Sequence, residues 1–138
     1  MGSVNNIRVL LVDDDVRVRQ TLSGILKPYS NIEVVGEASD GDEAVTSVGD
    51  LRPAVVVMDI SMKKMDGITA ARLIKAKYPN VLVVGCSAHT QEYNIYAMKR
   101  VCAFEALLKK EDATKDLYPA IQRVMAEGDR PAIAKDHN

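Results

Sequence analysis

Acidic side chains directly follow two of the short apolar runs in this sequence. The run over residues 7–12 ends in Asp13 and Asp14, and the run over 54–58 ends in Asp59. Carboxylates that share one site repel one another unless a cation or protons neutralise them. A hard divalent ion such as Mg²⁺ would relieve that repulsion and leave coordination positions free for phosphate oxygens.

A hydroxyl and an amine follow two further apolar runs. The run over 81–84 leads to Ser87, and the run over 106–108 leads to Lys109. Once a metal is bound, one carboxylate can attack phosphorus and form an aspartyl phosphate. The metal, a lysine and a hydroxyl would then neutralise the charge on the equatorial oxygens of the transferred group. These residue types therefore indicate phosphoryl transfer onto an aspartate.

The side chains can meet only if the apolar runs are parallel strands of one sheet. A fifth run covers residues 32–35, and three of the five are nearly continuous Val, Leu and Ile, as in strands covered by helices on both faces. Helical periodicity separates them, over 18–26, 40–50, 70–78, 93–97 and 117–125. Five such alternations predict an α/β fold with a doubly wound sheet and right-handed crossovers. Its functional crevice lies beyond the carboxyl ends of the strands.

Several polar residues are better explained by helix capping than by chemistry. Asp15, Asp40 and Asp66 each stand just before a helical stretch, and Glu43 completes a capping box with Asp40. Pro119 falls inside the last helical stretch, where a missing backbone donor is expected to bend or delay the helix.

Composition excludes several classes of protein. A chain of 138 residues with 18 basic and 19 acidic side chains is typical of one domain and does not favour binding nucleic acid by phosphate neutralisation alone. No apolar run approaches the length of a membrane span, so we expect no membrane contact. Cys86 and Cys102 form no scaffold or metal pattern, which predicts buried free thiols and a cytoplasmic location.

Four motifs, in order and in register, resemble the receiver domain of bacterial response regulators. They are Val12–Asp15, Met58–Gly67, Cys86–His89 and Leu107–Lys109, and the resemblance covers residues 7–127. It implies a flavodoxin-like three-layer (βα)5 fold whose five-stranded parallel sheet has the order 2-1-3-4-5. Residues 1–6 would be an N-terminal extension, and residues 128–138 a tail or the start of a linker.

The resemblance also implies roles for individual residues. Asp59 would accept the phosphoryl group, and Asp13, Asp14, Asp59 and the backbone carbonyl of Ser61 would hold Mg²⁺. These carboxylates belong to the family's acidic site.

The other two catalytic positions are Ser87 and Lys109. Ser87 would hydrogen-bond the new phosphoryl group and move with it, and Lys109 would pair with its oxygens. Ser61 and His89 match the variable positions that influence access of water in this family.

Two positions depart from the family pattern. Lys63 stands where a proline is usual, which places an additional charge near the site. Ala106 replaces the aromatic residue that in many members moves inward on phosphorylation, and Phe104 or Tyr96 could substitute for it.

The resemblance implies a phosphorylation-controlled switch, most like the receivers of LuxR-type regulators. A sensor histidine kinase, a phosphotransfer protein or a small phosphodonor would phosphorylate Asp59, and the face formed by helix four, strand five and helix five would respond, for example by homodimerisation. DNA would be contacted only through an output domain absent from this chain. The protein would catalyse only its own phosphorylation and dephosphorylation.

Two alternatives remain open from the sequence. Lys63 and Ala106 give some support to a phosphorylation-independent interaction scaffold with the same fold. A phosphatase with an aspartyl phosphate intermediate would want a second Asp two residues after the nucleophile, and that position is Ser61.

Overall fold

A parallel five-stranded sheet between two layers of helices forms the part of the chain that the computed structural model describes, residues 6–88 and 104–128. The strand order is β2-β1-β3-β4-β5, and every described pair is parallel, as predicted. The elements are β1 (Ile7–Val12), α1 (Val16–Leu26), β2 (Ile32–Ala38), α2 (Gly41–Leu51), β3 (Val55–Met58), α3 (Gly67–Lys77), β4 (Leu82–Ser87), β5 (Ala106–Lys109), a 3-10 turn (Lys110–Asp112) and α5 (Ala113–Gly128).

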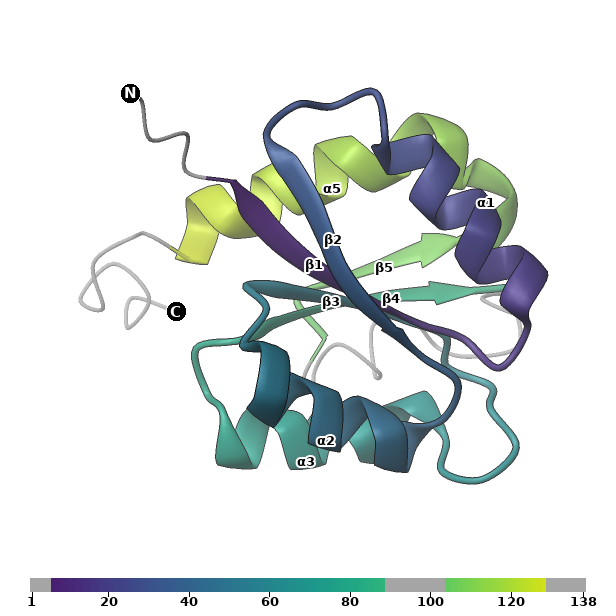
Figure 1. The fold of residues 1–138 in the computed structure, drawn as a ribbon, viewed down its shortest axis with the longest axis vertical. Coiled ribbons are helices and arrows are strands. Elements are labelled where there is room, and N and C mark those ends of the chain that lie inside the picture. The colour runs from purple at the N-terminus through teal and green to yellow at the C-terminus, as the bar shows by residue number, and fades with distance from the viewer. Residues whose placement is uncertain (1–5, 89–103, 129–138) are drawn as a thin grey trace.

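Helices cover both faces of the sheet, with α2 and α3 on one side and α1 and α5 on the other (Figure 1). Alternate side chains of each strand enter opposite core clusters because successive residues of a strand point to opposite faces. In β1, Leu10 and Val12 pack toward α2 and α3, whereas Val9 and Leu11 pack toward α1 and α5. All four are essentially inaccessible, which explains the unbroken apolar run.

Three aspartates cap the helices that follow the strand ends, as predicted. Asp15, Asp40 and Asp66 accept hydrogen bonds from the backbone N–H groups of Arg17 at 2.9 Å, Glu43 at 2.8 Å and Thr69 at 2.8 Å, respectively. The return bond of the capping box goes to the backbone N–H of Ser39, which donates to the Glu43 carboxylate, and not to that of the cap residue itself.

Helix α5 begins before Pro119 and continues through it. The helix starts at Ala113, directly after the 3-10 turn, so the predicted delay is wrong. Proline removes only the single backbone donor at its own position, and the stripe formed by Leu117, Ile121 and Val124 is fully packed against the sheet. Burial of that stripe outweighs one missing hydrogen bond.

Two strands are longer than the apolar runs that predicted them. Strand β2 extends to Ala38, and β4 continues through Gly85 and Cys86 to Ser87. The fourth helical stretch, around Tyr96, lies outside the described residues, as do Cys102 and His89. No helix within the described ranges has the length and apolar character needed to cross a membrane.

Candidate functional site

Three carboxylates converge at the carboxyl edge of the sheet. Asp13 and Asp14 follow β1, Asp59 follows the adjacent β3, and one oxygen from each of the three lies within 4.8 Å of the others. Asp13 and Asp59 are only 1% and 5% exposed, whereas Asp14 is open to solvent. The sequence-predicted acidic residues are therefore brought together, with one of them at the mouth of the site.

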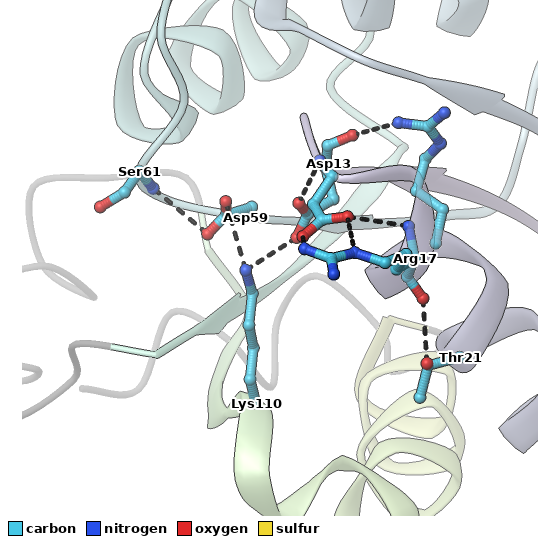
Figure 2. A network of polar contacts seen from close by, with 8 residues as sticks. Asp13, Arg17, Thr21, Asp59, Ser61 and Lys110 are labelled. Atoms are coloured by element: carbon cyan, nitrogen blue, oxygen red, sulfur yellow. Dashed lines mark hydrogen bonds and ion pairs between the residues drawn. The ribbon is translucent and has the colours of Figure 1, made fainter.

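The lysine at this site is Lys110, one residue later than predicted. Its Nζ lies 2.8 Å from Oδ2 of Asp13 and 3.4 Å from Oδ2 of Asp59, bridging the two buried carboxylates (Figure 2). Lys109 ends β5 with its side chain exposed. The structure therefore places Lys110, and not the predicted Lys109, beside the two carboxylates.

Strand alternation explains the correction. Leu11, Val57 and Leu108 all pack into the core cluster beneath α1 and α5. Asp13, Asp59 and the half-buried Lys110 each stand two positions after one of these side chains, so they share its side of the sheet. Lys109 instead shares its side with Leu107, which packs against the opposite cluster. Ala106 and Leu108 are the core residues of β5 on this side, and continuing their alternation by two positions would have predicted Lys110 from the sequence.

The buried carboxylates and the lysine perturb one another. Burial, together with the negative charge of Asp13, raises the pKa of Asp59 to about 6, although Lys110 and the backbone N–H of Ser61 counteract part of this rise. Burial disfavours the charged form of Lys110, yet its hydrogen bond to Asp13 and the charges of both aspartates outweigh this and raise the pKa of the ammonium group. The site thus carries excess negative charge that a bound cation would relieve.

Backbone groups fix the two buried aspartates. Oδ1 of Asp13 accepts from the N–H of Asp15 at 2.9 Å, and Oδ1 of Asp59 accepts from the N–H of Ser61 at 3.3 Å (Figure 2). Each carboxylate therefore keeps its second oxygen toward Lys110.

Helix α3 approaches the backbone of Asp59 more closely than any side chain would allow. A Cβ on Gly67 would lie 2.2 Å from the Asp59 carbonyl oxygen, and the Gly67 N–H donates to the carbonyl of Ile60 at 2.7 Å. The glycine of the Asp66-Gly67 pair therefore serves close packing, in addition to the turn that the sequence predicted.

The two predicted serines stand at or just beyond the carboxyl ends of the adjacent strands β4 and β3. Ser87 is fully buried at the end of β4, next to β3, where Met58 is in register with Gly85. Ser61 lies on the loop after β3 with its side chain exposed.

An open hollow adjoins the acidic cluster on the side of the loop after β3. It has a volume of about 450 Å³ and is lined by Asp14, Ile60, Ser61, Met62, Lys63, Asp66 and Ile68. Because Asp14 belongs both to this lining and to the acidic cluster, the hollow gives solvent and small molecules a path to the carboxylates.

Residues 9–122 match the family model of the response regulator receiver domain. The chain belongs to this family. It is 32% identical over 132 residues to protein-glutamate methylesterase/protein-glutamine glutaminase 1 of Myxococcus xanthus, covering 96% of this chain and 38% of that protein. It is 34% identical over 117 residues to the response regulator protein VraR of Staphylococcus aureus, covering 85% of this chain and 56% of that protein. The receiver thus spans about half or less of these relatives.

Solved receiver structures have the same fold. The response regulator domain of Thermotoga maritima CheB superposes with a TM-score of 0.81 and 31% identity, covering 88% of this chain and 97% of that domain. A LuxR-family response regulator from Aurantimonas gives a TM-score of 0.81 at 26% identity, covering 95% of this chain and 94% of the other. The neighbours therefore include LuxR-family receivers, as the resemblance implied, and also CheB-like receivers, which it did not predict.

The receiver has a buried phenylalanine close to β4. Ala106, at the position where many family members have an aromatic residue, is only 1% exposed. Its side chain packs in the core beneath α1 and α5. Phe104 is 4% exposed and packs on the opposite side, with ring atoms 3.1 Å from where a Cβ on Gly85 would be. Tyr96, the other aromatic candidate, lies outside the described residues.

Cys86 is a buried free thiol, as predicted. It is 1% exposed in the cluster beneath α1 and α5, and burial raises the pKa of its thiol to about 12. A thiol that stays protonated at neutral pH is a poor nucleophile, so Cys86 belongs to the core and not to the chemistry.

Proposed function

We propose that this receiver accepts a phosphoryl group on Asp59 and uses it as a signalling switch. The observation that carries the proposal is the convergence of three carboxylate oxygens within 4.8 Å around a lysine that bridges two of them. A purely structural ion pair would not need a third, exposed carboxylate beside an open hollow. That excess of negative charge fits a site built to work with a cation.

The donor set fits Mg²⁺. Carboxylates of Asp13, Asp14 and Asp59, with the backbone carbonyl of Ser61, are hard oxygen ligands of the kind this ion prefers. When bound, the ion supplies charge neutralisation for the carboxylates and for the phosphoryl oxygens. The exposed position of Asp14 leaves this edge of the site open to an incoming donor.

The residues of the chain divide the transfer among them. An oxygen of Asp59 forms the new bond to phosphorus while the bond from phosphorus to the leaving group breaks, and the leaving group departs with the electron pair. Lys110, already beside Asp59, pairs with the phosphoryl oxygens in place of the predicted Lys109. The hydroxyl of Ser87, at the end of the adjacent strand, donates a hydrogen bond to the new group. The added charge, about −1.5 to −2, then biases the surrounding surface.

The proposed partners follow from family membership. We infer a cytoplasmic protein whose donor is a sensor histidine kinase, a phosphotransfer protein or a small phosphodonor. The proposed responding surface is the face of β5 and α5 together with the predicted fourth helix, which lies outside the described residues, and homodimerisation is one output. Contact with DNA belongs to an output domain and not to the receiver, and the receiver acts as a signalling module that turns over only its own phosphoryl group.

The test is intact-mass analysis after incubation with acetyl phosphate and Mg²⁺. The parent protein is expected to gain one phosphoryl group, and Asp59→Asn none. No gain on the parent, when a separate titration shows that Mg²⁺ binds, would favour the phosphorylation-independent scaffold. Equal labelling of both proteins would overturn the assignment of Asp59.

A further inference from the structure

A lysine on the loop after β3 faces the hollow beside the acidic cluster. Lys63 lines this hollow together with Asp14 and Ser61, and its side chain is exposed. Within the described part of the chain, no carboxylate forms an ion pair with it. The next lysine is different, since Nζ of Lys64 lies 3.7 Å from Oδ2 of Asp40, at the start of α2. Of the two adjacent lysines, only Lys63 therefore lines the hollow.

The charges of the site show what this lysine could bind. Three carboxylates are balanced by Lys110 and one divalent cation, so the loaded site is close to neutral. An incoming phosphoryl group adds about 1.5 to 2 negative charges that these groups do not balance. Asp66, which lines the hollow in addition to Asp14, adds to this excess, although its carboxylate accepts a hydrogen bond from the N–H of Thr69 at the start of α3. Lys63 is the cation available on that wall.

The size of the hollow is suited to a small donor. A volume of about 450 Å³ corresponds to roughly fifteen water molecules at about 30 Å³ each. This space holds a small acyl phosphate with solvent around it.

We propose that Lys63 is a donor-binding residue, whose ammonium group attracts and holds the dianionic phosphoryl group of a small acyl phosphate in this hollow. The inference rests on the proposed function of Asp59. With acetyl phosphate, an Asp59 oxygen bonds to phosphorus, the bond from phosphorus to the bridging oxygen breaks, and acetate leaves with the electron pair. Lys63 keeps its proton throughout and acts only by its charge.

The first experiment compares rates of phosphorylation by intact mass. Lys63→Met keeps the aliphatic stem and removes the charge, Lys63→Arg keeps the charge, and Lys64→Met is the matched control. We expect the second-order rate constant with acetyl phosphate to fall about 3- to 10-fold in Lys63→Met, as for one partly screened charge. The arginine variant and the control should stay within about twofold of the parent. The same loss with phosphoimidazole would place the effect on the phosphoryl group, which both donors share.

Salt separates an electrostatic role from a structural one. The difference between the parent and Lys63→Met should shrink toward unity in about 0.5 M NaCl, because exposed charges are screened over a few ångströms there. A loss that is independent of salt and persists in Lys63→Arg would show a role in loop conformation and overturn the proposal. An equal loss in Lys64→Met would show a general surface potential and overturn it too.

A second readout does not depend on transfer. Titration of the Mg²⁺-loaded protein with acetylphosphonate, which cannot transfer its phosphorus, is followed by amide chemical shifts around the hollow. Weaker binding by Lys63→Met than by Lys64→Met supports the proposal even if the parent is never phosphorylated, in which case the proposed function fails alone. Equal binding and equal rates would remove Lys63 from the site while leaving Asp59 as the acceptor.

Discussion

Replacing Asp59, the proposed phosphoacceptor, with its neutral isostere should stabilise the metal-free protein. The pKa of Asp59 is raised from 3.8 to about 6 by burial and by the charge of Asp13. The folded state therefore binds a proton at Asp59 more tightly than the unfolded state does, and the parent loses stability as the pH rises from about 4 through 6. Asp59→Asn carries no such charge and escapes this loss.

The size of the effect follows from the shift. A rise of about 2 pKa units corresponds to about 3 kcal/mol at pH 7.5, where the loss is complete, and to roughly half of that at pH 5. The gain of Asp59→Asn over the parent should follow this profile. Mg²⁺ at about ten times its dissociation constant should stabilise the parent by about 1.4 kcal/mol. This reduces the difference in free energy of unfolding between Asp59→Asn and the parent.

Urea unfolding of both proteins in chelator, at several pH values between 5 and 8, measures this difference. The reasoning is refuted if Asp59→Asn is no more stable than the parent at pH 7.5, or if its advantage does not change with pH. A pH-independent gain would mean that the substitution improves packing without relieving charge. Asp50→Asn serves as the control for removal of one exposed carboxylate outside the acidic cluster.

Three further substitutions test other parts of the site. Lys110→Met should slow phosphorylation of Asp59 by about 100-fold or more, as when one fixed charge-stabilising donor is lost, whereas Lys109→Met should have little effect. The rates are measured by intact mass. The reverse order of the two effects would restore Lys109 as the lysine that pairs with the phosphoryl group. Gly67→Ala should lower the free energy of unfolding in urea by about 1–3 kcal/mol, because its Cβ would lie 2.2 Å from the Asp59 carbonyl; an unchanged midpoint would contradict that contact. Asp40→Ala removes the cap of α2 and should cost about 1 kcal/mol in the same assay without slowing phosphorylation; slower labelling would show that this cap supports the site.

Much of the fold was predictable because the apolar runs and the helix caps indicate the same succession of strands and helices. The run over 7–12 matches β1 at both ends, since its unbroken apolar character reflects burial on both faces. The caps at Asp15, Asp40 and Asp66 mark where the following helices begin. Family resemblance supplied the strand order, which apolar periodicity cannot give.

What the sequence missed depends on neighbours distant along the chain. Matching the family motif does not distinguish two adjacent lysines, and the side of the sheet on which each one lies decides which of them reaches the carboxylates. The close approach of Gly67 to Asp59 joins two segments through the packing of α3, so a turn was the only role visible beforehand. The effect of Pro119 on the start of α5 was overestimated, because the helix, with one face packed against the sheet, tolerates one missing backbone donor.

Asp13, Asp59 and Lys110 lie on the same side of the sheet, and this restricts where residues can be inserted or deleted. Removing the one residue between Val57 and Asp59 would place the Asp59 side chain on the face covered by α2 and α3, away from Lys110. Successive side chains of a strand point to opposite faces of the sheet. A similar change at 28–31, in the connection that leads into β2, leaves the spacing from core to charge intact. Natural variation in length should therefore gather at the amino ends of the strands, while spacing at their carboxyl ends stays fixed.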